Sequence, residues 1–168
     1  MSLLAPLQLV CLVAFGVLLV VAAWQDVRTL RIADGLALGI VASYALWALS
    51  GLALATSSYS YIGFALLGAG VLFAAGAGAF ALGALGGGDV KLLAAASLFA
   101  GPALIADFLL VTAIVGGVLG AAILSGAPLG PARPASEATL DTRLGRGLPY
   151  GPAIAAGGLW VAALLTLH

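Results

Sequence analysis

The chain has 168 residues, of which 64% are hydrophobic and 7% are charged, and its mean hydropathy is +1.25. Soluble domains are roughly one half apolar, so this composition predicts a membrane protein. The formal net charge of zero leaves no basic surface for nucleic acid, and a single cysteine, Cys11, excludes a disulfide framework and a cysteine zinc site.

Apolar runs separated by polar residues or by Gly and Pro predict an all-α protein with about six transmembrane helices in a single domain. Each run should be helical, because lipid offers no hydrogen-bond partners to the backbone. The first run has no cation before Arg28 and is too long for a signal peptide, so we interpret it as a retained helix. The expected ranges are roughly 3–24, 35–55, 61–83, 89–101, 103–125 and 150–167.

The fourth run is too short to cross a bilayer alone. From Asp89 to the break at Gly101 and Pro102 is about twelve residues, or ~18 Å, against a hydrocarbon core of ~30 Å. We therefore expect the fourth and fifth runs to form a hairpin that turns early, with Asp89 at a shallow depth. Asp107 is expected to cap the fifth helix on the opposite side of the membrane.

The cations predict the orientation of the bundle. All six fall on one side: Arg28, Arg31, Lys91, Arg133, Arg143 and Arg146. The positive-inside rule makes that side cytoplasmic and places both termini outside. Five of the six acidic residues share it: Asp26, Asp34, Asp89, Glu137 and Asp141. Residues of about 126–149, rich in Pro, Gly and small polar side chains, predict a flexible cytoplasmic loop.

Several catalytic chemistries are excluded by residue type. The one histidine, His168, is the last residue and lies opposite the charged cluster, which disfavours a serine-histidine site. The sequence has neither an HExxH zinc motif nor a phosphate-binding loop. Carboxylate chemistry remains. Asp26 follows the first helix in WQDVRTLRIADGL (24–36), and Asp89 opens the fourth.

Two carboxylates brought together at a poorly hydrated depth would share one proton, as in aspartic proteases. Structural roles stay open: Asp89 and Asp34 are both placed to cap a helix, and Asp26 could pair with Arg28 or Arg31. Lys91 is about 200° around the helix from Asp89, so we interpret it as an interfacial anchor.

Three glycines, Gly86, Gly87 and Gly88, precede Asp89. A helix cap does not need them, and each costs backbone entropy. They suit a close approach to another helix or to an extended substrate. We therefore expect Gly87→Ala to impair activity while leaving the bundle folded.

Two segments, D-V-R-T-L-R-I (26–32) and G-G-G-D (86–89), resemble the prepilin peptidase family of GxGD membrane aspartic proteases. A third, LPYGPAIAAGGL (148–159), resembles its short members that process Flp-type pilins of tight-adherence secretion systems. The resemblance implies an endopeptidase of the bacterial inner membrane, without a metal or other cofactor. It would remove the basic leader of prepilins or pseudopilins at the cytoplasmic face, for use by the pilus assembly machinery. Asp26 and Asp89 would be the catalytic dyad, with supporting roles for Gly86, Gly87, Gly88, Asp34, Lys91 and Tyr150.

The sequence departs from the family in two places. Larger members carry an N-terminal domain with paired cysteines that methylates the new pilin terminus, and nothing here matches it, so we expect no methyltransferase activity. The family commonly has Ile-Pro-Asn where this chain has Ile32-Ala33-Asp34. Three alternatives stay open: a small proton-coupled transporter with the carboxylates as a relay, a non-catalytic scaffold of a secretion complex, and archaeal preflagellin processing.

Overall fold

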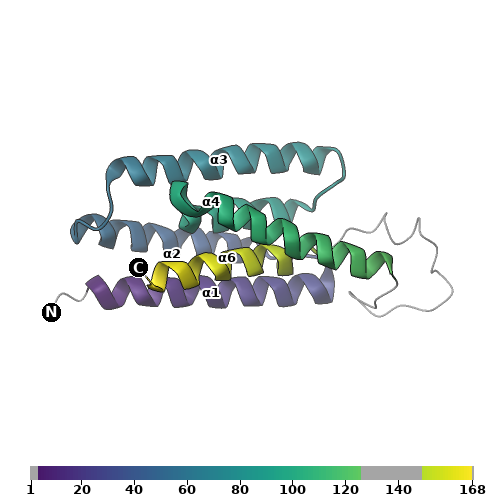
Figure 1. Ribbon diagram of the computed structural model, residues 1–168, viewed down its shortest axis with the longest axis horizontal. Coiled ribbons are helices and arrows are strands. Elements are labelled where there is room, and N and C mark those ends of the chain that lie inside the picture. Colours follow the sequence, from purple (N-terminus) through teal and green to yellow (C-terminus); the bar gives the residue numbers. More distant parts are fainter. Residues whose placement is uncertain (1–3, 126–148, 168) are drawn as a thin grey trace.

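The computed structural model describes residues 4–125 and 149–167, and every regular element in these ranges is an α-helix (Figure 1). The all-helical prediction is confirmed for this part of the chain. The helices are α1 (Leu4–Thr29), α2 (Asp34–Ala53), α3 (Tyr59–Ala81), α4 (Gly87–Leu124) and α6 (Gly151–Leu167).

Four of these helices, α1 to α4, are long and apolar enough to cross a membrane, and α6 is a shorter apolar helix of 17 residues. Six separate spans are therefore not confirmed, because the expected fourth and fifth helices form the single element α4. The first helix also ends later than expected. It continues to Thr29 and stops where Leu30 adopts a positive φ of 51°, so Asp26 lies inside α1.

The predicted hairpin corresponds to a sharp bend inside α4. Gly101 has φ 54° and ψ −168°, a combination that only glycine adopts readily, and Pro102 follows it. In Figure 1 the first arm runs away from the connection with α3, and the second arm returns to that end of the bundle. Residues 87–100 rise only ~21 Å, less than a bilayer core. Asp107 is an exposed residue within the second arm, so the expected cap is wrong.

An aromatic cluster holds the first arm of α4 between α1 and α2. The rings of Phe99 and Phe15 stack with their centroids 4.2 Å apart, and Tyr44 meets Phe99 edge-on at 5.4 Å. Trp47 lies beside the same ring at 5.9 Å. Phe15 and Phe99 are fully buried, so this cluster packs the first arm of α4 against α1 and α2.

The described start of α1 and end of α6 lie at one end of the bundle in Figure 1. The opposite end carries the connection of α1 with α2, that of α3 with α4, and the start of α6. Which end faces the cytoplasm, and therefore on which side of the membrane the termini lie, stays a prediction. The predicted loop of about 126–149 lies almost entirely outside the described residues, as do Arg133, Glu137, Asp141, Arg143, Arg146 and His168.

Candidate active site

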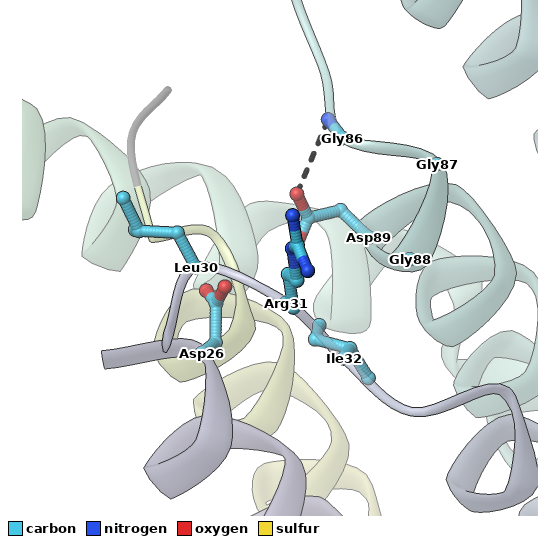
Figure 2. Close-up of a pocket in the computed structure, with 8 residues that line it drawn as sticks. All are labelled: Asp26, Leu30, Arg31, Ile32, Gly86, Gly87, Gly88 and Asp89. Carbon is cyan, nitrogen blue, oxygen red and sulfur yellow. Dashed lines mark hydrogen bonds between the residues drawn. The ribbon is translucent and has the colours of Figure 1, made fainter. Parts of the chain in front are cut away.

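The structure brings Asp26 and Asp89 together at the end of the bundle where α4 and α6 begin. Both carboxylates line one cavity of about 270 Å³. Figure 2 shows Asp26 rising from α1 on one side of it and Asp89 from α4 on the other. Their exposed fractions are only 3% and 7%. The other lining residues are Leu30, Arg31, Ile32, Gly86, Gly87 and Gly88.

Asp26 is held by the start of α6. The backbone N–H of Gly151 donates a hydrogen bond to Asp26 Oδ2 at 2.7 Å. The expected alternative, an ion pair of Asp26 with a neighbouring arginine, is not found among the described residues. The guanidinium of Arg28 instead lies over the ring of Trp24, 4.5 Å from its centroid.

Asp89 is held by its own helix start. The N–H of Gly86 donates to Asp89 Oδ2 at 3.2 Å, while Oδ1 is buried and has no hydrogen-bond partner in the described part of the chain. The expectation that Asp89 is the N-cap is wrong, because Gly86 occupies that position and Asp89 is the third residue of the helix. A capping box has two reciprocal hydrogen bonds, and here only the bond from the Gly86 N–H to the Asp89 side chain can form, because glycine has no side chain.

The three glycines before Asp89 differ in what surrounds them. A Cβ at Gly86 would lie 2.7 Å from Asp89 Oδ2, and one at Gly88 would lie 3.1 Å from Ile32 Cβ and 3.3 Å from its carbonyl oxygen. A Cβ at Gly87 would make ordinary contact with the Phe80 ring at 3.5 Å. A Cβ would therefore crowd its neighbours at Gly86 and Gly88 but not at Gly87, and the expectation for Gly87 is revised.

Asp34 and Lys91 pair with each other outside the dyad cavity. Lys91 Nζ lies 2.7 Å from Asp34 Oδ1, and the two side chains are 46% and 66% exposed. The expected cap at Asp34 is wrong, since Ala33 is the N-cap of α2 and Asp34 is the first helical residue. As expected, Lys91 does not contact Asp89. The ion pair joins the start of α2 to the first arm of α4, and its exposure limits its contribution to stability.

Tyr150 also lies outside the dyad cavity. It is partly buried and lines a separate apolar cavity of about 620 Å³ formed by α4 and α6. Its carbonyl accepts a hydrogen bond from the N–H of Ile154 at 3.0 Å, which begins α6 one residue before Gly151. Tyr150 thus contributes to the site through its backbone, by starting the helix that reaches Asp26.

Sequence reasoning missed four residues at the site: Gly151, Leu30, Arg31 and Ile32. Gly151 belongs to the segment 148–159, in which the resemblance implies a supporting role only for Tyr150. The other three follow Asp26 and line the cavity because the positive φ of Leu30 turns the chain back over the end of α1. Figure 2 shows Arg31 and Ile32 on the Asp89 side of this turn.

The arrangement is suited to acid and base catalysis. Two carboxylates in a partly enclosed cavity can hold one proton between them and act as an acid and a base toward the same bond. Within residues 4–125 and 149–167, no group of three or more His, Cys, Asp or Glu side chains is placed to bind a metal ion.

Comparison with known proteins gives one match. A family model, described as the type IV leader peptidase family, matches residues 13–121, a range that contains both aspartates and ends before Gly151. No curated protein and no solved structure matches the chain.

Proposed function

The family model covers more than half of the chain, so the chain belongs to the type IV leader peptidase family, and we propose that it is an aspartic endopeptidase with Asp26 and Asp89 as its catalytic dyad. The observation that carries the proposal is that these two buried aspartates, 63 positions apart in sequence, line one cavity. The proposed substrates are Flp-type prepilins or pseudopilins, which combine a basic leader with an apolar helix.

The proposed reaction uses one proton shared by the two carboxylates. The ionised carboxylate takes a proton from a water molecule as that water attacks the scissile carbonyl carbon. The protonated partner donates a hydrogen bond to the carbonyl oxygen and stabilises the charge that develops there. When the C–N bond breaks, a carboxyl group returns a proton to the leaving amine. At roughly 30 Å³ per water molecule, the cavity has room for the attacking water and a short stretch of substrate backbone.

The substrate would meet the enzyme along a backbone edge with few side chains. Gly86, Gly87 and Gly88 line one wall of the cavity, so an extended peptide could approach their backbone closely. A Cβ at Gly87 would lie against the ring of Phe80, which does not line the cavity. Arg28, Arg31 and Lys91 are near this end of the bundle, which by the positive-inside rule is cytoplasmic. A basic leader would then be cut at the cytoplasmic face of the inner membrane while the pilin helix lies alongside in lipid.

The experiment is cleavage of an Flp-type prepilin by membranes that contain equal amounts of wild-type enzyme or a variant. We expect Asp26→Asn and Asp89→Asn each to lower the rate by about 100-fold or more, the contribution of a positioned acid or base. Asp107→Asn is a matched control, since Asp107 is an exposed aspartate outside the cavity, and it should cleave at the wild-type rate.

A dyad variant that matures the pilin at the normal rate would overturn the assignment. If the protein is a non-catalytic scaffold, pilin maturation should be unchanged in both asparagine variants, because asparagine also caps helices well. If the protein is a proton-coupled transporter, reconstituted vesicles should show ion or solute flux, and the pilin should mature normally in cells that lack the protein. Cleavage in inverted but not in right-side-out vesicles tests the proposed membrane face.

A further inference from the structure

The start of α6 reaches the dyad from the far end of the sequence. Gly151 is buried, and its N–H donates to Asp26 Oδ2 across 125 positions of the chain. Of the two aspartates, Asp26 is the one held by a different helix, whereas Asp89 is held by the turn that precedes it. The orientation of the Asp26 carboxylate therefore depends on where the first turn of α6 lies.

The hydrogen bond has a favourable electrostatic setting. Gly151 is the first residue of α6, and the first N–H groups of a helix have no partner within the helix. They carry the positive end of the helix dipole, which attracts a carboxylate. One oxygen of Asp26 is thereby fixed in direction, so the other oxygen keeps a constant place relative to the cavity.

A side chain at position 151 would break this contact. A Cβ there would lie 2.7 Å from Asp26 Cβ, 2.9 Å from Oδ2 and 3.1 Å from Cγ. The Cβ of Asp26 is fixed to the α1 backbone, so it cannot rotate away as the end of a flexible side chain would. The backbone of residue 151 cannot retreat easily either, because Ala153, Ile154 and Ala155 are buried directly after it.

Asp89 is held in the same way as Asp26. Gly86 donates its N–H to Asp89 Oδ2, and a Cβ at Gly86 would lie 2.7 Å from that oxygen. Each carboxylate thus accepts one N–H from a glycine at a helix start, and each glycine permits the approach because it has no side chain. Gly86 belongs to the GxGD motif, while Gly151 lies beyond the residues that the family model matches.

We propose that Gly151 is a positioning residue for Asp26, which makes the start of α6 the third structural component of the active site. This inference rests on the proposed peptidase function. It assigns to the Pro149-Tyr150-Gly151-Pro152 segment the orientation of a catalytic carboxylate rather than packing alone.

The test compares Gly151→Ala with two other glycine substitutions in the prepilin cleavage assay. Gly35→Ala adds a Cβ in the first turn of α2, where nothing lies within 4 Å. Gly158→Ala adds one on α6 against the side chains of Leu19 and Phe15 of α1, which disturbs the same helix pair away from Asp26. Rates are divided by the amount of folded enzyme, measured by gel filtration in detergent, and thermal unfolding is recorded for each variant.

For Gly151→Ala we expect kcat to fall by about 10- to 100-fold with little change in KM, since a displacement of ~1 Å can cost 100-fold in rate. The pH dependence of kcat should also change, because a hydrogen bond to a carboxylate weights its two protonation states differently. Gly35→Ala should match the wild type. Gly158→Ala should lower the unfolding temperature and leave kcat per folded molecule unchanged.

Wild-type kcat in Gly151→Ala would overturn the inference, as would an equal loss of kcat in Gly158→Ala. If Gly151→Ala does not fold, ¹⁵N-glycine labelling of the intact protein tests the contact directly. The Gly151 amide proton should shift when Asp26 is changed to Asn, and an unchanged shift would refute the bond. Full activity of Asp26→Asn would instead defeat the proposed function, so the two failures can be told apart.

Discussion

An alanine scan of the three glycines before Asp89 tests whether the motif works through close contacts. The predicted order of activity is Gly87→Ala near the wild type, then Gly88→Ala, then Gly86→Ala. At Gly87 the new Cβ meets only the Phe80 ring at 3.5 Å, an ordinary contact. Alanine is better than glycine in a helix by ~1 kcal/mol, so Gly87→Ala should be slightly stabilising.

The other two substitutions crowd the site in different ways. At Gly88 the Cβ would lie 3.1 Å from Ile32 Cβ and 3.3 Å from the Ile32 carbonyl oxygen. To relieve these contacts, α4 and residue 32 must separate by a few tenths of an ångström. Overpacking of this kind costs about 1–3 kcal/mol of stability, and the higher helix propensity of alanine offsets part of that cost. We expect a several-fold loss of rate. At Gly86 the Cβ would lie 2.7 Å from Asp89 Oδ2, so it should displace the carboxylate itself and cost about 10- to 100-fold in kcat.

The assay is prepilin cleavage with purified enzyme in detergent, paired with thermal unfolding of each variant. Gly70→Ala, on α3 with nothing within 4 Å of the new Cβ, is a control for the effect of alanine in a helix. If Gly87→Ala loses as much activity as Gly86→Ala, then close contact does not explain the glycines. Equal, full activity of all three variants would mean that they serve only the turn.

Three further predictions concern the fold around the site. Gly101→Ala should lower the free energy of unfolding by about 1–3 kcal/mol or more, since alanine would be forced to φ 54° and its Cβ would overlap the Tyr61 phenol ring. Denaturant titration measures this loss, and an unchanged free energy of unfolding would contradict the bend. Phe99→Ala should destabilise the bundle by about 3–5 kcal/mol, because Phe99 is fully buried among aromatic rings. A loss of less than about 1 kcal/mol in the same titration would show that the aromatic cluster is dispensable. A double-mutant cycle on Asp34 and Lys91 should give a coupling of at most about 1 kcal/mol, since the pair is exposed, and unchanged cleavage rates; strong coupling would assign the pair a larger role.

Much of the helical architecture could be predicted from local chemistry. Long apolar runs require helices in lipid, so the approximate ranges of α1, α2, α3 and α6 followed from the sequence. The bend at Gly101 was predictable too, because a proline in the interior of a helix removes a backbone hydrogen bond and clashes with the preceding turn. Helix ends were less accurate: α1 continued past Trp24 to Thr29, since polar residues can extend a helix beyond its apolar run.

Residue type alone identified Asp26 and Asp89 as candidates, because a carboxylate at membrane depth is costly unless it has a use. Pattern could not say which local role each acidic residue has. The N-cap of α4 is Gly86 rather than Asp89, and Asp34 pairs with Lys91 instead of capping α2. The first assignment depends on the residue at which the helical backbone begins, and the second on where α4 lies relative to α2.

The tertiary structure alone decided how the site is assembled. Asp26, Asp89 and Gly151 come from three helices, and no periodicity or spacing relates them. Their meeting follows from helix packing, which places α6 against α1 and α4, and α4 against α2. The required glycines follow from the same packing: a position tolerates a side chain or excludes it according to which atoms of distant segments lie within contact distance, as Gly87 and Gly151 illustrate.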